Sequence, residues 1–244
     1  MTNYKIFNND CFNVFPNIKD KTINLFLLDL PYAQTACKWD SLIDLDKMWK
    51  EIKRTMKSNA VIVFFCTTKF GNTLINSNPK WFRYDLVWEK SRKVGFLSAN
   101  KMPLRKHEMI YVFKKEGGTY NPQKTEGKPY KANDRKCEIY SGNEIIKEYK
   151  KEDGKYPTTI LKFNNPSKSL HRTQKPTDLL EWLIKSYSNE NDIVCDFTMG
   201  SGSTGIACLN TKRQFLGIEK DKDIFKVAEV RLKTHLDVVN EIKK

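Results

Sequence analysis

Short apolar runs alternate with amphipathic stretches along most of this chain of 244 residues. An unbroken apolar run such as 60–65 predicts a buried strand, whereas apolar residues at helical spacing from Asp44 to Lys57 predict an amphipathic helix. Strands are expected at 4–7, 23–28, 60–65, 84–88, 109–113, 192–196 and 215–219, and helices at 44–57, 68–76, 177–188, 203–210 and 225–239. This alternation predicts an α/β fold in which helices cover both faces of a mostly parallel sheet.

The pattern breaks down between about Lys114 and Lys168, where five glycines and four prolines interrupt the sequence. We expect an insertion there that is partly loop, is built on the scaffold rather than forming part of its sheet, and contains a short helix near 143–151. The chain then divides into 1–114, 115–168 and 169–244, and the first and last segments together form one α/β domain.

The charge of the chain is strongly basic and uneven. Its 43 Lys and Arg against 29 Asp and Glu give a formal net charge of +14, and the stretch from Trp81 to Lys175 supplies 22 − 11 = +11 of it. A polyanionic partner is expected, with nucleic acid ahead of an acidic membrane surface. A solubilising surface is the alternative. Aromatic residues interleave with the charges and could stack on bases, but Trp88 and Tyr111, inside strand-like runs, are expected in the core.

The six cysteines contain no C-x-x-C pair, and with three scattered histidines they show no zinc-ligand spacing. Cys66 and Cys195 lie in apolar runs, where a reduced cysteine behaves as a small hydrophobic residue. No signal peptide is recognisable and no apolar stretch approaches about 18 residues. We therefore expect a cytoplasmic protein without a metal site and without a membrane span.

The tetrapeptide Asp29-Leu30-Pro31-Tyr32 follows the predicted strand 23–28. A carboxylate, a main-chain carbonyl and an aromatic ring at a strand end can together hold a planar exocyclic amine. The signal is weak alone, and it gains weight from a second cluster at 196–205.

In that second cluster, Gly200, Gly202 and Gly205 lie between a predicted strand and a predicted helix. Glycine allows a sharp turn and a close approach of ligand to main chain. Glu219 ends the next strand, 19 residues after Gly200, where a carboxylate can accept hydrogen bonds from ribose hydroxyls. The spacing suits any adenosine-containing cofactor, so an NAD-dependent oxidoreductase is an alternative, as is a tight turn without ligand. Against the oxidoreductase, the cluster lies near the C-terminus, Asp196-Phe197 replaces an apolar strand end, and no hydride-transfer site is recognisable.

Taken together, these motifs resemble the amino-group DNA methyltransferases that use S-adenosylmethionine. More narrowly, they resemble the beta-ordered group, in which the catalytic tetrapeptide comes first, the target-recognition region second and the cofactor motif last. Gln174-Lys175-Pro176, Asn9-Asp10-Cys11 and the run 217–221 match the same family. The resemblance covers most of the chain outside 115–168. It implies an α/β, Rossmann-like, mostly parallel seven-stranded sheet with helices on both faces and an inserted target-recognition region.

The resemblance also implies roles for individual residues. Double-stranded DNA would be the partner, and a target base would be flipped out of the duplex. Asp29 and the Leu30 carbonyl would accept hydrogen bonds from the target amine, and Tyr32 would stack on the base. No metal is needed. The implied catalytic residues are Asp29, Leu30, Pro31 and Tyr32, and the implied S-adenosylmethionine-binding residues are Asp10, Cys11, Asp29, Lys175, Asp196, Phe197, Gly200, Ser201, Gly202 and Glu219.

Several alternatives stay open. The family's tetrapeptide usually has two prolines, so Leu30 makes the loop less rigid and raises the alternative of a catalytically dead DNA-binding module. Asp at position 29 favours adenine N6, because relatives that act on cytosine N4 usually carry Ser there. Lys175 could instead be a solvated charge, and Asp10 a turn residue. Base or phosphate contacts are expected from the insertion, with Tyr130, Lys131, Asn133 and Arg135 as candidates, and a homodimer is a further implication of the family.

Overall fold

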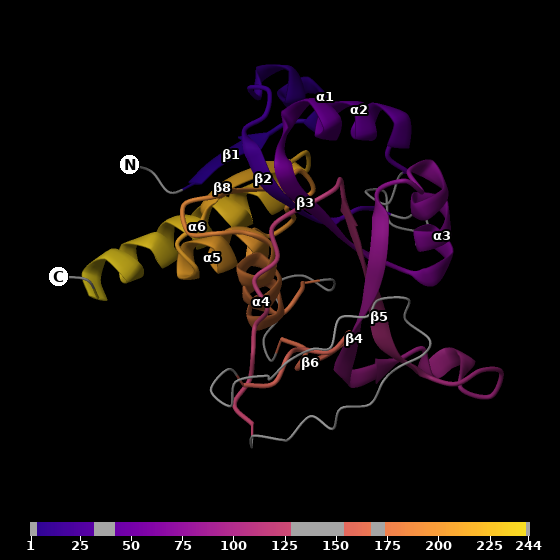
Figure 1. Ribbon diagram of the computed structural model, residues 1–244. Helices are drawn as coiled ribbons and strands as arrows, with labels where there is room; N and C mark the ends of the chain where they lie inside the picture. Colours follow the sequence, from indigo (N-terminus) through magenta and orange to yellow (C-terminus); the bar gives the residue numbers. More distant parts are fainter. Residues whose placement is uncertain (1–3, 32–41, 128–153, 167–173, 243–244) are drawn as a thin grey trace, which may run out of the picture. The chain divides into compact units, whose positions relative to one another are not determined.

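The computed structural model describes residues 4–31, 42–127, 154–166 and 174–242. Chain contacts divide the protein into one unit of 1–121 with 159–244 and a second unit of 122–158. Elements of the first unit, shown in Figure 1, are β1 (Tyr4–Asn8), α1 (Cys11–Val14), η1 (Phe15–Asn17), β2 (Ile23–Asp29), α2 (Leu45–Thr55), β3 (Met56–Cys66), α3 (Thr68–Ser77), β4 (Phe82–Val94), η2 (Phe96–Ser98), β5 (Arg105–Lys114), β6 (Ile160–Phe163), α4 (Thr177–Tyr187), β7 (Ile193–Asp196), α5 (Ser203–Asn210), β8 (Gln214–Glu219) and α6 (Lys222–Ile242).

The strands of this unit form one sheet in the order β1-β8-β7-β2-β3-β5-β4-β6. All neighbours are parallel except β3–β5 and β5–β4, so the prediction of a mostly parallel sheet is confirmed. The expected number of seven strands is wrong, because the described residues form eight. The additional strand is β6, which pairs with β4 and whose Phe163 carbonyl accepts a hydrogen bond of 2.9 Å from the Trp88 indole. Residues 160–163 were expected to lie outside the sheet, and that prediction is also wrong.

The order of the strands reverses between β2 and β7, which are adjacent and parallel. From β2 the chain proceeds through α2 to β3 on one side, and from β7 through α5 to β8 on the other. Right-handed connections that run in opposite directions place their helices on opposite faces and leave a crevice where the strands end. That crevice lies beyond the carboxyl ends of β2 and β7, where Asp29 and Asp196 are found.

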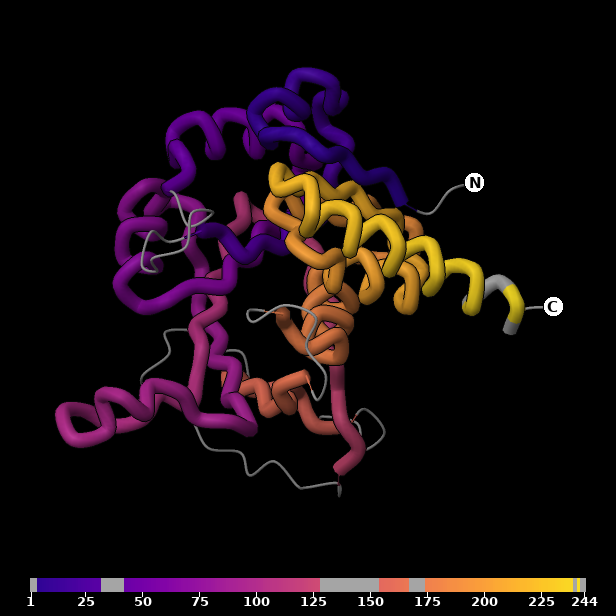
Figure 2. The backbone as a smooth tube through the Cα atoms, turned by 180° about the vertical axis from the view of Figure 1, so that it is seen from behind, coloured from indigo at the N-terminus to yellow at the C-terminus, as the bar shows by residue number. Residues whose placement is uncertain are grey.

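Two apolar layers cover the sheet. One layer joins one face to α4, α5 and α6, with Leu183, Ala207 and Leu232 among its buried residues. The other joins the opposite face to α1, α2 and α3, and Figure 1 shows these two groups of helices apart. Trp88 and Tyr111 are buried, as predicted. Seen from behind in Figure 2, the C-terminal helix α6 runs beside the N-terminal strand β1, with which it is in contact.

In the second unit, the described parts are 122–127 and 154–158. Thr125 and Lys155 form an antiparallel bridge, and the Lys124 ammonium lies 4.5 Å from the centroid of the Tyr156 ring. The helix predicted near 143–151 lies outside the described residues. Across the parts of the chain that are described, no helix has both the length and the apolar character to cross a membrane.

Candidate active site

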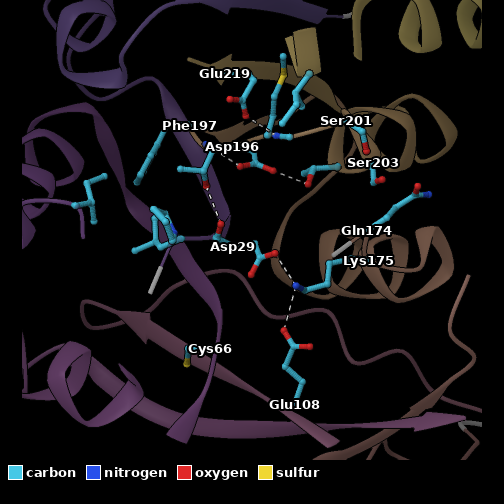
Figure 3. Close-up of a pocket in the computed structure, with 18 of the residues that line it drawn as sticks. Asp29, Cys66, Glu108, Gln174, Lys175, Asp196, Phe197, Ser201, Ser203 and Glu219 are labelled. Carbon is cyan, nitrogen blue, oxygen red and sulfur yellow. Dashed lines mark hydrogen bonds and ion pairs between the residues drawn. The ribbon is translucent and has the colours of Figure 1, made fainter. Parts of the chain in front are cut away.

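A cavity of about 1260 Å³ opens at the carboxyl edge of the sheet in the first unit. Cavities that hold one small ligand usually measure about 300–1,000 Å³, so the volume of this one lies above that range. Its lining comes from the ends of β1, β2, β3, β7 and β8 and from the hairpin of β4 and β5. In Figure 3, Asp29 lies between a group containing Asp196, Ser201 and Glu219 and a group containing Lys175 and Glu108.

The first group belongs to the glycine loop, residues 196–205, which joins β7 to α5. Asp196 is buried, and its carboxylate accepts hydrogen bonds from the Thr204 hydroxyl (2.7 Å) and the Thr198 N–H (3.1 Å). Burial raises the pKa of Asp196 to about 7, although both hydrogen bonds favour the charged form. The carboxylate therefore ties the start of the loop to the first turn of α5.

Glu219 ties the middle of the glycine loop to the end of β8. One carboxylate oxygen accepts the Gly200 N–H at 3.0 Å and the other accepts the Asp221 N–H at 2.8 Å. Burial raises the pKa of Glu219 against the effect of these two donors. Both oxygens have further lone pairs, so the carboxylate can accept hydroxyl donors in addition.

Arg231 on α6 reaches the same loop. Its guanidinium donates to the Ser201 carbonyl at 3.1 Å and to the Ser203 hydroxyl at 2.9 Å. Burial lowers the pKa of Arg231, but an arginine stays charged at any ordinary pH. Arg231 follows the run 217–221 by ten residues, and its contact with the loop depends on the packing of α6.

The backbone of the loop requires glycine at two positions. Gly200 and Gly202 have φ values of +52° and +80°, in the left-handed region that other residues rarely adopt. A Cβ built at Gly200 would have no atom within 4 Å, so open space lies beside that main chain. The open space beside Gly200 and the Glu219 carboxylate next to it together fit an adenosine-containing cofactor that approaches the main chain closely.

The second group, Lys175 and Glu108, lies beside Asp29, which ends β2. Lys175, just before α4, places its ammonium 2.6 Å from Asp29 Oδ2 and 3.1 Å from Glu108 Oε1. The Lys175 side chain is only 11% exposed, so the alternative of a solvated charge is wrong. Burial opposes its positive charge, but the two carboxylates outweigh that effect and raise the pKa of Lys175. Lys175 also lies 5.0 Å from the centre of the Phe65 ring.

Glu108 extends this contact into a charge chain of four residues, Lys90, Glu108, Lys175 and Asp29. Lys90 on β4 bonds Glu108 Oε2 at 2.7 Å, and its ammonium lies 4.7 Å from the Trp88 ring. Burial opposes the charge of Glu108, but Lys175 and Lys90 lower its pKa overall. Sequence reasoning missed both Glu108 and Lys90. The available signal was a carboxylate at the start of a strand, directly before the apolar run 109–113.

The two predicted segments meet in the cavity. The Thr198 hydroxyl, in the glycine loop, donates to the main-chain carbonyl of Asp29 at 3.2 Å, across a separation of 169 residues. Asp29 therefore bonds through its main chain to one group and through its side chain to the other. The tetrapeptide and the glycine cluster form two walls of one cavity.

The remaining predicted residues are placed as follows. Asp10 caps α1 and accepts the Phe12 N–H at 2.9 Å, as a turn residue does, and it also lines the cavity. Cys11 is buried, which raises the pKa of its thiol to about 12. Phe197 packs edge-on against Phe15 with ring centroids 5.3 Å apart.

The Leu30 side chain is buried in the layer under α1 and α2, so the apolar core anchors it. Pro31 is partly exposed and lines the cavity. Tyr32 and the four candidates at 130–135 lie outside the described residues. Whether each predicted residue contacts a ligand stays a prediction.

A family model described as a DNA methylase matches residues 23–230. Among curated proteins, the chain is 27% identical to the Type II methyltransferase M1.MboII of Moraxella bovis over 90% of this chain and 92% of that one. It is also 27% identical to the Type II methyltransferase M.HinfI of Haemophilus influenzae over 98% of this chain and 70% of the other.

Two solved structures share the fold. The M1.HpyAVI–SAM complex superposes with a TM-score of 0.67 at 24% identity, covering 94% of this chain and 98% of the other. The PvuII DNA methyltransferase, described as cytosine-N4-specific, superposes with a TM-score of 0.69 at 15% identity, covering 99% and 93%.

Proposed function

Because this chain belongs to the DNA methylase family, we propose that it transfers a methyl group from S-adenosylmethionine to N6 of a flipped-out adenine in duplex DNA. Membership of the family makes it a site-specific DNA methyltransferase. The choice of adenine N6 over cytosine N4 is the finer part of the proposal.

One observation carries the proposal: the Asp29 carboxylate lines the large cavity and bonds Lys175, while the Asp29 carbonyl bonds the glycine loop. An amine that enters the cavity can therefore meet a negative oxygen whose position is fixed from two sides. The amino group of a paired base faces its partner inside the duplex, so the base must leave the stack to reach this position.

The charge of Asp29 suits the reaction. Alkylation makes the amine nitrogen positive, and a carboxylate that accepts its N–H becomes a stronger partner as that charge develops. Lys175 and Glu108 keep the carboxylate oriented before the substrate arrives. Orientation prepared in advance costs nothing at the moment of reaction, so it lowers the barrier rather than only improving binding.

The cofactor supplies an activated methyl group on a sulfonium when it is bound. In the proposal, Glu219 accepts hydrogen bonds from its ribose, residues 196–202 surround its methionine part, and Asp10 lies near its adenine. The open space at Gly200 supports this arrangement. Lys175 is proposed to act toward Asp29 rather than toward the methionine carboxylate, because two carboxylates of the chain already contact its ammonium.

Asp at position 29 supports adenine as the target, since the cytosine-N4 relatives of this family usually carry Ser in the tetrapeptide. A carboxylate also accepts a hydrogen bond from the amine with more negative charge than a hydroxyl oxygen does. The family match argues against the oxidoreductase alternative that the glycine spacing had left open. Segment 115–168 is proposed as the target-recognition region. It lies within the stretch from Trp81 to Lys175, which supplies +11 of the formal net charge of +14, and this charge supports a DNA contact.

The test uses the full chain, radiolabelled S-adenosylmethionine and duplex DNA of varied sequence. Labelled DNA is digested to nucleosides, and mass spectrometry separates N6-methyladenine from N4-methylcytosine. We expect N6-methyladenine alone from wild type and none from Asp29→Ala. N4-methylcytosine would overturn the choice of base, and cofactor binding without any labelled DNA would favour the catalytically dead module. Sequencing of modified bases in DNA from expressing cells then gives the target word.

A further inference from the structure

The hairpin of β4 and β5 ends in an exposed apolar tip. Phe96 is 82% exposed and Leu97 fully exposed, in the short helix η2 at the turn, and Met102 nearby is 60% exposed. Gly95 opens the turn with a φ of +94°, and a Cβ there would meet no atom within 4 Å. The glycine therefore serves the turn geometry, which presents the two large side chains to solvent.

All charged side chains around this tip are basic. Residues 90–107 contain six Lys and Arg and no Asp or Glu. Of these, Lys90 bonds Glu108 and Lys106 bonds Glu89, whereas Arg92, Lys93 and Lys101 are exposed side chains at the tip. An apolar tip surrounded by positive charge suits a partner that offers phosphates outside and an apolar stack inside, which describes duplex nucleic acid.

The same hairpin forms part of the cavity. Val94 and Arg105, which face each other across its two strands, line the cavity together with Asp29. Lys90 and Glu108 of the charge chain lie further down the same strands. Any DNA that delivers a nucleobase to Asp29 would therefore pass close to the Val94–Arg105 end of the hairpin, next to its tip.

Resting on the proposed function, we propose that Phe96 and Leu97 form a wedge that enters the duplex beside the extruded base. Extrusion leaves a gap in the stack, and apolar side chains that fill such a gap lower the cost of unstacking. Arg92, Lys93 and Lys101 would neutralise the flanking phosphates and hold the hairpin in place.

A second copy of this chain is the competing occupant of an exposed apolar tip. A symmetric contact would bring the same surface of each copy together, and here it would oppose two hairpin tips, residues 90–107, that contain no acidic residue. Like charges held in contact repel, whereas phosphates attract the same side chains. The charge distribution therefore favours DNA.

The test compares Phe96→Ser/Leu97→Ser with wild type on two duplexes that carry the target word. In one duplex the target adenine is paired, and in the other it lies opposite an abasic site, which removes much of the cost of extrusion. We expect the variant to methylate the paired duplex about tenfold more slowly and the abasic duplex within about twofold of wild type. Phe96→Leu should keep most of the activity, because it preserves an apolar tip.

Val230→Ser is the matched control, because Val230 on α6 is 64% exposed and lies far along the chain from the hairpin. Unchanged affinity for S-adenosylmethionine in calorimetry shows that the folded cavity persists. Arg92→Gln/Lys93→Gln should slow methylation of both duplexes equally. It should also reduce the slope of log K for DNA binding against log salt concentration by about 2.

Three results would overturn the wedge. The double-serine variant could methylate the paired duplex as fast as wild type, or lose activity equally on both duplexes. It could also sediment as a smaller species than wild type, which would make the tip an interface between copies. If wild type methylates no duplex, the proposed function itself fails and the wedge falls with it.

Discussion

The glycine loop is fixed by hydrogen bonds among residues 196–231, whereas Asp29 is fixed by a charge chain whose members lie up to 146 residues apart. In the first wall of the cavity, which the glycine loop forms, carboxylates accept hydrogen bonds from main-chain N–H and hydroxyl donors, and glycines supply the backbone shape. In the second wall, which carries Asp29, two lysines alternate with two carboxylates in a largely buried row.

This difference matches what each wall has to do. A loop that surrounds a cofactor needs a defined main-chain shape, which short-range hydrogen bonds provide. A carboxylate that meets a developing positive charge needs a fixed direction, and an ion pair in a partly dry site provides it. The walls should therefore respond differently to substitution, the first mainly in cofactor affinity and the second mainly in turnover.

The largest effect is expected from Asp29→Asn. The amide keeps the shape of the side chain but removes the negative charge, so kcat should fall by about 100-fold to 1,000-fold. Affinity for S-adenosylmethionine should change little, because the glycine loop is not altered. Single-turnover methylation and calorimetry measure the two quantities.

Asp44→Asn is the matched control, since Asp44 lines the same cavity and caps α2. Asparagine caps a helix about as well as aspartate, so this variant should resemble wild type. Retention of kcat within tenfold in Asp29→Asn would remove Asp29 from the chemistry.

The second prediction concerns pH and the first wall. The Asp196 carboxyl keeps its proton up to about pH 7 in the folded protein, whereas it titrates near about 3.9 in an unfolded chain. Between these values the folded state binds more protons, so this group makes the free energy of unfolding fall as pH rises. The decrease amounts to at most about 4 kcal/mol.

Asp196→Asn should remove that decrease, because an amide does not titrate in this pH range. The amide can still form hydrogen bonds with Thr198 and Thr204, so the loop should keep its shape. Urea unfolding at intervals from pH 4 to pH 7 measures the difference between wild type and variant. Parallel pH curves for the two proteins would show that Asp196 does not titrate in this range.

The third prediction tests the second wall through Glu108→Gln. The neutral amide leaves Lys90 and Lys175 with less negative charge nearby, and the loss of one partner from a buried ion pair costs about 3 kcal/mol. We expect a lower free energy of unfolding and a lower kcat, because Lys175 would hold Asp29 less firmly. The loss in stability should shrink below about pH 4, where Glu108 becomes protonated in the unfolded chain.

Glu89→Gln is its control, since Glu89 lies on the facing strand and bonds the exposed Lys106. Exposed ion pairs contribute little to the free energy of unfolding, so this variant should keep the stability and turnover of wild type. Equal losses in both variants would mean that the charge chain has no special role.

The smallest effect is expected from Arg231→Met. The glycine loop loses three hydrogen bonds to α6, and the cofactor should bind about fivefold more weakly with kcat unchanged. Arg231→Lys should recover part of the affinity. A drop in kcat at saturating cofactor would contradict the separation of the two walls.

Much of the fold was predictable, because apolar runs and helical periods are local properties of the chain. The predicted strands and helices outside the insertion agree with the structure to within a few residues, apart from a longer hairpin of β4 and β5, whereas the short helices α1 and η1 were not predicted. Strand β6 was missed because four residues without clear alternation, inside a stretch rich in glycine and proline, carry little local signal. Its place in the sheet depends on pairing with β4.

The sequence by itself determined the two motifs, the basic charge and the alternation that builds a parallel sheet, because each is written in residues close together along the chain. Tertiary structure alone decided that Lys90, Glu108 and Lys175 converge on Asp29, and that Leu30 is anchored in the core where a proline usually stands. The reason is physical: a buried charge is stable only beside its partner, and strand order, not sequence distance, selects which partner that is.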